Sequence, residues 1–144
     1  MVFASQSERQ HASIISGSDV VLIGPGLGCD AWAEQLLDVV LKHSDNIILD
    51  ADALNLLTEK KIAALAAKSI ISTPHPGEAA GLLSVSSKEV QQDRFNAAQA
   101  IQGAIGGITI LKGNGTIVFD GQSILLCGYG NQGMATAGMD HVLA

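Results

Sequence analysis

The chain has 144 residues, of which 47% are hydrophobic and 15% charged, a composition that excludes an intrinsically disordered protein and allows a substantial core. A net charge of −6 and an aromatic content of 3% argue against a surface for nucleic acids or acidic membranes. Two cysteines are too few for a disulfide framework, and no signal peptide or membrane-length apolar run is visible, so we expect a cytoplasmic protein.

Short apolar runs alternate along the chain with longer segments in which apolar residues recur at helical spacing. The short runs predict six strands, at residues 20–23, 46–50, 70–73, 108–111, 116–119 and 123–126. The last two strands flank Asp120-Gly121, which is a hairpin signal.

Helices are predicted over residues 31–42, as two short pieces over 54–65, from Ser86 to Ile101, and from Met134 to the end of the sequence. Ser86 and Glu89 have the spacing of a capping box. Strands of continuous apolar residues separated by helices predict the α/β class: a mostly parallel sheet with helices on both faces, in a single domain over residues 1–144.

Open α/β sheets bind ligands at the carboxyl ends of their strands, so the loops after the strands are the candidate sites. The first strand is followed by the glycine-rich residues 24–28 (GPGLG), which can direct backbone amides at a ligand or form a tight turn without one. The second strand is followed by Asp50 and Asp52. These carboxylates can hold Mg²⁺ through water or bind hydroxyls; alternatively, Asp52 only caps the next helix.

Three further loops carry candidate binding residues. In residues 73–78 (TPHPGE), two prolines stiffen the backbone around His75, and this favours a ligand contact over a structural histidine. Residues 112–116 (KGNGT) suit a phosphate or nucleotide, with a simple glycine turn as the alternative, although they lack the P-loop spacing. Residues 128–138 lead into a predicted helix start, where exposed amides can form an anion hole; tight helix packing is the alternative.

Together these loops resemble those of the ADP/ATP-dependent NAD(P)H-hydrate dehydratases, the carbohydrate-kinase-domain family of the ribokinase-like superfamily. Five motifs carry the resemblance, in order: VLIGPGLG (21–28), LDADALN (49–55), TPHPGE (73–78), LKGNGT (111–116) and GNQGMA (130–135). The resemblance spans about residues 18 to 143. It implies a ribokinase-like fold that is present as a fragment, incomplete at both ends.

The resemblance implies a lyase that repairs nicotinamide cofactors. Its substrate would be the S form of hydrated NADH or NADPH, and ADP or ATP with Mg²⁺ would drive the dehydration. The nicotinamide hydroxyl would be phosphorylated, and phosphate would then leave as the double bond is restored. The resemblance also implies a homo-oligomer at full length, with no nucleic-acid or membrane partner.

The resemblance also assigns site residues. Gly26 and His75 would contact the hydrated dinucleotide, and no residue is assigned to a metal. The adenine nucleotide would be bound by Lys112, Gly113, Asn114, Gly115, Thr116, Asn131 and Gly133.

The last family motif, Gly-Met-Gly-Asp-Val-Leu, differs in this sequence. In the family its second glycine contacts phosphate and its aspartate is the catalytic base, whereas residues 138–143 here read GMDHVL. Asp140 stands at the glycine position and His141 at the aspartate position. Asp140 is therefore the candidate catalytic residue, although a shift of one residue turns it by about 100° around a helix axis.

Two other functions stay open at this stage. One is a small-molecule kinase of the ribokinase-like superfamily, and the other is a degenerate protein that binds nucleotide without turnover. The motifs around His75 and Asp50 favour the dehydratase over the kinase, whereas the Asp140-His141 pair motivates the degenerate alternative.

Overall fold

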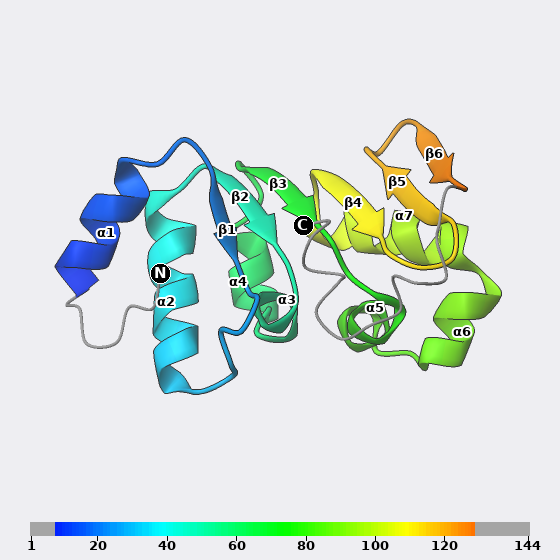
Figure 1. Cartoon of the computed structure of the whole chain (residues 1–144), viewed down its shortest axis with the longest axis horizontal. Coiled ribbons are helices and arrows are strands. Elements are labelled where there is room, and N and C mark those ends of the chain that lie inside the picture. Colours follow the sequence, from blue (N-terminus) through cyan, green and yellow to red (C-terminus); the bar gives the residue numbers. More distant parts are fainter. Residues whose placement is uncertain (1–7, 129–144) are drawn as a thin grey trace.

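The computed structural model describes residues 8–128, and its centre is a six-stranded sheet in which the strands follow one another in chain order (Figure 1). The strands are β1 (Val21–Ile23), β2 (Asn46–Leu49), β3 (Ser69–Ser72), β4 (Ile108–Leu111), β5 (Thr116–Phe119) and β6 (Ile124–Cys127). Strands β1 to β4 are parallel, β5 is antiparallel to β4, and β6 is antiparallel to β5. The predicted mostly parallel sheet is confirmed, with every strand boundary within one residue of its prediction.

Seven helices are described: α1 (Glu8–Ser16), α2 (Ala31–His43), α3 (Asp52–Asn55), α4 (Glu59–Ala63), α5 (Pro76–Leu83), α6 (Ser87–Gln92) and α7 (Arg94–Ile105). Helices α1 and α5 were not predicted from the sequence. The helix predicted after Ser86 is divided at Asp93, which has a non-helical backbone and caps α7 by accepting a hydrogen bond from the Asn96 N–H. The helix predicted from Met134 lies outside the described residues.

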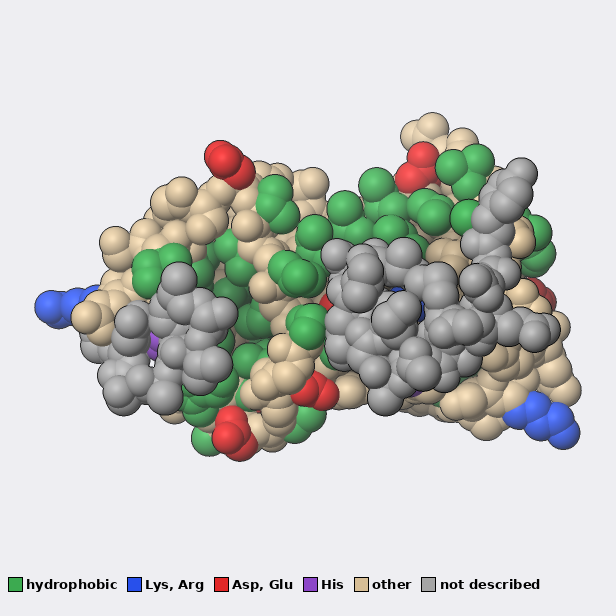
Figure 2. Space-filling model, in the orientation of Figure 1, with side chains coloured by type: hydrophobic (Ala, Val, Ile, Leu, Met, Phe, Trp, Pro, Cys, Tyr) green, Lys and Arg blue, Asp and Glu red, His purple; other side chains and the backbone are tan. Residues whose placement is uncertain are grey.

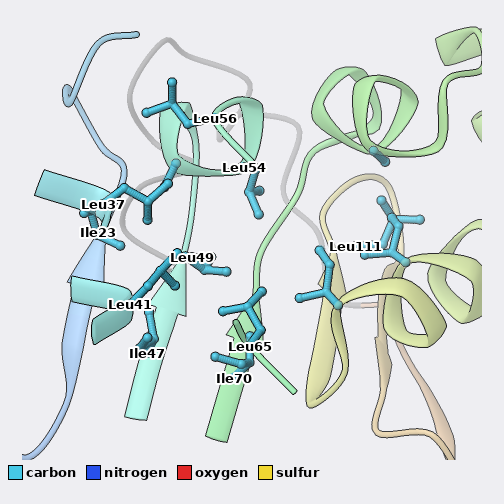
Figure 3. Packing of buried hydrophobic residues seen from close by; sticks show 14 of the residues in the cluster. Ile23, Leu37, Leu41, Ile47, Leu49, Leu54, Leu56, Leu65, Ile70 and Leu111 are labelled. Carbon is cyan, nitrogen blue, oxygen red and sulfur yellow. The ribbon is translucent and has the colours of Figure 1, made fainter. Parts of the chain in front are cut away.

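The main core lies between the sheet and the helices that connect its parallel strands. Because these strands follow one another in chain order, crossovers of the same hand bring the connecting helices to the same face. Figure 3 shows Leu37 and Leu41 of α2 beside Ile47 and Leu49 of β2, and all four side chains are buried. Burying a leucine or isoleucine side chain stabilises the fold by about 1.5–3 kcal/mol, so these contacts fix the sheet firmly to α2.

The opposite face of the sheet is partly exposed. Side chains on strands alternate between the two faces, and Leu22, Ile108 and Leu125 are 47%, 36% and 66% exposed. Figure 2 shows hydrophobic side chains on the surface over the strands. The prediction of helices on both faces therefore holds for one face within residues 8–128, because the sequential strand order returns each crossover to the same side.

None of the helices within residues 8–128 has the length and apolar character needed to cross a membrane.

Candidate functional site

Four of the predicted loops lie at the same edge of the sheet, which we call the loop edge. Because β1 to β4 are parallel, the loops that begin at Gly24, Asp50, Thr73 and Lys112 all leave from the carboxyl ends of these strands. Two antiparallel steps make β6 run in the direction of β4, so Gly128 leaves the sheet at the same edge. The predicted site residues Asn131, Gly133 and Asp140 lie outside the described residues, as does His141.

Asp50 is fully buried at the centre of the loop edge. Its Oδ1 accepts a hydrogen bond of 2.7 Å from the Thr73 hydroxyl and one of 2.8 Å from Lys112 Nζ. Buried charges are stable only when they are paired and hydrogen-bonded, and the Asp50–Lys112 ion pair meets that requirement. One carboxylate oxygen therefore joins the loops after β2, β3 and β4.

The position of Lys112 changes how its loop can bind a nucleotide. The family resemblance assigns Lys112 to the nucleotide, whereas in the structure its ammonium is directed inward at Asp50 and is buried. Gly113 and Asn114 are exposed, and Gly115 is half-buried. The surface that this loop offers to a ligand is therefore mainly its backbone.

Asp52 connects the loop after β2 to the glycine loop after β1. Its Oδ2 accepts a hydrogen bond of 2.8 Å from the Gly28 N–H. The suggestion that Asp52 only caps a helix is wrong, because the N-cap of α3 is Ala51 and no side chain caps this helix. Ala51 has a φ of 45°, a region that non-glycine residues rarely adopt, so the backbone between the two aspartates is strained.

The glycine loop lies tightly against Asp50 at Gly24, whereas it is more open at Gly26. At Gly24 an added Cβ would lie 1.6 Å from the Asp50 carbonyl oxygen, so only glycine fits. Gly26 has a φ of 66°, and an added Cβ there would meet no atom of residues 8–128 within 4 Å. Among these residues, the space beside Gly26 is open to a ligand.

His75 is the N-cap of α5 and forms a capping box with Glu78. His75 Nδ1 accepts hydrogen bonds of 2.9 Å from the Gly77 N–H and 3.4 Å from the Glu78 N–H, while the His75 N–H donates to Glu78 Oε2 over 2.9 Å. His75 Nε2 lies 3.0 Å from Glu78 Oε1. The structure therefore shows a structural role for His75, and both ring nitrogens take part in it.

The capped histidine can still meet a ligand. Its side chain is 44% exposed, whereas that of Glu78 is 9% exposed. Because Nδ1 accepts hydrogen bonds, the neutral ring carries its proton on Nε2, where Glu78 accepts it. A ligand would meet an imidazole that is fixed in orientation.

The structure adds one residue that the sequence analysis did not select, Arg94. Its Nη1 donates to the Asn114 carbonyl over 2.6 Å, and its Nη2 donates to the Leu111 carbonyl over 3.2 Å. The predicted continuous helix from Ser86 to Ile101 gave no signal for it, because only the structure shows that α7 begins directly after the Asp93 cap, where the helix dipole makes a positive charge unfavourable.

The described residues offer no cluster of three or more histidine, cysteine, aspartate or glutamate side chains that could hold a metal ion. Asp50 and Asp52, the carboxylates considered for Mg²⁺, each accept hydrogen bonds from protein donors. One oxygen of each carboxylate, Asp50 Oδ1 and Asp52 Oδ2, is thus occupied by protein donors, and we assign no metal ligand.

Comparisons with known proteins agree with this geometry. The profile of a family described as NAD(P)H-hydrate dehydratase matches residues 1–144. The bifunctional NAD(P)H-hydrate repair enzyme Nnr of Coxiella burnetii is 46% identical over 132 residues, which are 91% of this chain and 26% of that protein. The ADP-dependent (S)-NAD(P)H-hydrate dehydratase of Neisseria meningitidis is 40% identical over 128 residues, which are 85% of this chain and 43% of that protein.

A solved structure is similar as well. The ADP/ATP-dependent NAD(P)H-hydrate dehydratase of Bacillus subtilis, co-crystallised with ATP and Mg²⁺, has a TM-score of 0.66 and 27% identity, covering 88% of this chain and 47% of that chain. The chain thus spans about a quarter of the length of the bifunctional relatives that it matches and less than half of the length of the single-function ones.

Proposed function

Because the chain belongs to the NAD(P)H-hydrate dehydratase family, we propose that it takes part in the ADP- or ATP-dependent dehydration of the S form of hydrated NADH or NADPH. The observation that carries this proposal is the convergence of four loops at one edge of the sheet, three of them joined through the buried Asp50 carboxylate. The names of the Neisseria and Bacillus relatives state the substrate and the nucleotide for those proteins.

The proposed reaction replaces a poor leaving group with a good one. The hydroxyl on the hydrated nicotinamide ring attacks the terminal phosphorus of the nucleotide: a new O–P bond forms, the bond to the leaving nucleotide breaks, and a base accepts the hydroxyl proton. The ring C–O bond then breaks with loss of phosphate, and loss of a proton from the neighbouring carbon restores the double bond. A protein promotes such a transfer mainly by positioning the groups and stabilising charge.

The order of the strands supports the division of the loop edge between the two ligands. We assign the hydrated dinucleotide to Gly26 and His75, in the loops after β1 and β3. We assign the adenine nucleotide to Lys112, Gly113, Asn114, Gly115 and Thr116 after β4, with Asn131 and Gly133 after β6. Neighbouring strands lie about 4.8 Å apart, so the loops of β3 and β4 can bring a hydroxyl and a phosphate together.

Lys112 has an indirect part in this proposal. Its ammonium pairs with Asp50, so the phosphates would meet the exposed amides of its loop rather than the ammonium. Mg²⁺ usually binds through phosphate oxygens and water with few protein ligands, and we assign no step to it. Asp140 remains the proposed catalytic base.

The test is an assay of the purified chain with S-form hydrated NADH, ADP or ATP, and Mg²⁺. We expect NADH absorbance to return together with release of phosphate, and no recovery when the nucleotide is omitted. Transfer of phosphate to an alcohol without recovery of NADH would support a small-molecule kinase instead. Nucleotide binding without turnover, also after Asp140→Gly and His141→Asp, would support the degenerate alternative.

We also propose that residues 1–144 belong to one domain, that the protein is cytoplasmic, and that its full-length form is a homo-oligomer. The continuous sheet from β1 to β6 supports the single domain. Light scattering tests the oligomer, and fractionation of cells tests the compartment.

A further inference from the structure

Arg94 lies beside the loop after β4 and donates hydrogen bonds to three carbonyl oxygens, one in the last residue of β4 and two in the loop. Nη1 is 2.6 Å from the Asn114 oxygen, and Nη2 is 3.2 Å from the Leu111 oxygen and 3.4 Å from the Lys112 oxygen. Gly113 permits this approach, since an added Cβ there would lie 2.8 Å from Nη2. The guanidinium is therefore fitted to this particular loop.

Because the peptide bond is planar, these contacts also fix the direction in which the neighbouring N–H groups point. In a trans peptide the C=O and the following N–H point in opposite directions. Because the Lys112 and Asn114 carbonyls point at Arg94, the N–H groups of Gly113 and Gly115 point away from it. Neither of these N–H groups has a hydrogen-bond acceptor within residues 8–128.

The other side of the loop is fixed as well. The Leu111 carbonyl points at Arg94, and the next amide, the Lys112 N–H, donates in the other direction to the Pro74 oxygen over 2.8 Å. The Lys112 side chain is tied to Asp50. The loop is thus held from both sides, while the N–H groups of Gly113 and Gly115 have no acceptor within residues 8–128.

The charge of Arg94 is not neutralised within the described residues, where no carboxylate forms a salt bridge with it. It also lies in the first turn of α7, where the helix dipole makes a cation unfavourable. Partial burial lowers the pKa of the guanidinium from its ordinary value, because burial disfavours the charged form. A cation in such a position is best explained by an anion that it helps to bind.

We propose that Arg94 is a positioning residue for the adenine nucleotide. It holds the loop of residues 112–115 so that the amides of Gly113 and Gly115 face the phosphates, and it adds positive charge behind them. This inference rests on the proposed function, since it takes the ligand of this loop to be a nucleotide.

The test is the affinity of the full chain for ADP and for adenosine, measured by calorimetry, in the wild type and in Arg94→Met and Arg94→Lys. Arg9, the other arginine of the sequence, is exposed on α1, and Arg9→Met is the matched control for loss of one positive charge. We expect Arg94→Met to weaken ADP binding about tenfold or more, because several hydrogen bonds from a charged donor are lost. Arg94→Lys keeps the charge without the planar guanidinium, so its affinity for ADP should lie between those of the wild type and Arg94→Met.

Adenosine separates the proposed role from a general loss of structure. Since adenosine has no phosphate, its affinity should change less than twofold in Arg94→Met, and Arg9→Met should bind both ligands as the wild type does. Equal ADP affinity in the wild type and Arg94→Met would overturn the inference, and so would an equal loss for ADP and adenosine.

The test also covers a variant that does not fold and a wild-type chain that does not bind ADP. If Arg94→Met does not fold, Arg94→Lys and Gly113→Ala test the same contact, and unchanged ADP affinity in both would overturn the inference. A wild-type chain that binds no ADP would contradict the proposed function itself. Binding in the wild type with no effect at Arg94 would contradict only the role of Arg94.

Discussion

Asp50 and Lys112 are separated by 62 residues in the sequence and form a buried ion pair of 2.8 Å at the loop edge. They follow β2 and β4, and β3 lies between these two strands and supplies Thr73 to the same oxygen of Asp50. The pair therefore ties together three strands whose order defines the site. Its loss would affect both stability and the spacing of the loops.

We predict that Asp50→Asn lowers the free energy of unfolding by about 3–5 kcal/mol, because it leaves the Lys112 ammonium buried without its counter-charge. Urea unfolding measures the change. The double variant Asp50→Leu/Lys112→Met should be more stable than Asp50→Asn, since it removes both buried charges.

The Lys68–Asp45 pair is a matched control for this prediction. It has a distance of 3.3 Å, and its aspartate side chain is 91% exposed. Exposed pairs contribute about 0–1 kcal/mol, so Asp45→Asn should change stability little. Equal effects of Asp50→Asn and Asp45→Asn would show that the buried pair does not hold the loop edge together.

A pair of glycines in α5 tests the histidine cap. At Gly77 an added Cβ would lie 2.7 Å from His75 Cε1, so Gly77→Ala should displace the imidazole and lower stability by about 1 kcal/mol, the usual value of an N-cap. At Gly81 an added Cβ meets no atom of the described residues 8–128 within 4 Å, so Gly81→Ala should raise stability by about 0.5–1 kcal/mol. Thermal unfolding of both variants measures the difference.

The same two variants report on ligand binding. Affinity for hydrated NADH should fall in Gly77→Ala and stay unchanged in Gly81→Ala, because only the first change moves the exposed imidazole. If both variants bind hydrated NADH equally well, His75 serves the helix cap alone.

The strands and the loop edge could be predicted because they depend on local patterns. Apolar runs mark the buried strands, and parallel strands bring their carboxyl ends to one edge. Helix α5 was missed because the prolines around His75 suggested a stiff loop. The same residues also carry the signals of a helix start, with Pro76 at the first helical position and Glu78 completing a capping box.

The direction of Lys112 could not be predicted, because it depends on Asp50, a partner distant in the sequence. Local pattern shows that a lysine follows a strand but does not show whether its ammonium points at a ligand or at a buried carboxylate. Arg94 has the same difficulty, since its acceptors lie 17 to 20 residues away. Contacts of this kind appear only when the strands are placed side by side.

Asp52 is predicted to affect binding more than stability. Asp52→Ala removes the hydrogen bond to the Gly28 N–H and should cost about 1 kcal/mol or less in unfolding, because the bond is exposed. Affinity for hydrated NADH should fall several-fold, since the glycine loop loses its link to α3. Asp19→Ala is the control, because Asp19 is exposed and its side chain forms no hydrogen bond or ion pair within residues 8–128. An equal affinity in the two variants would contradict a role for Asp52 in binding.

Glu89 makes the stability of α6 depend on pH. The Ser86 hydroxyl and the Ser86 N–H donate to its carboxylate and hold the pKa of Glu89 below its usual value of 4.5. Since the folded state favours the ionised form, this contribution is present above the unfolded pKa and is lost as the pH falls through the lower folded pKa. Glu89→Gln should therefore be less stable than the wild type at neutral pH, and the difference should shrink below about pH 4.5. Thermal unfolding at a series of pH values measures it, and a difference that stays constant down to acidic pH would show that the carboxylate charge does not contribute.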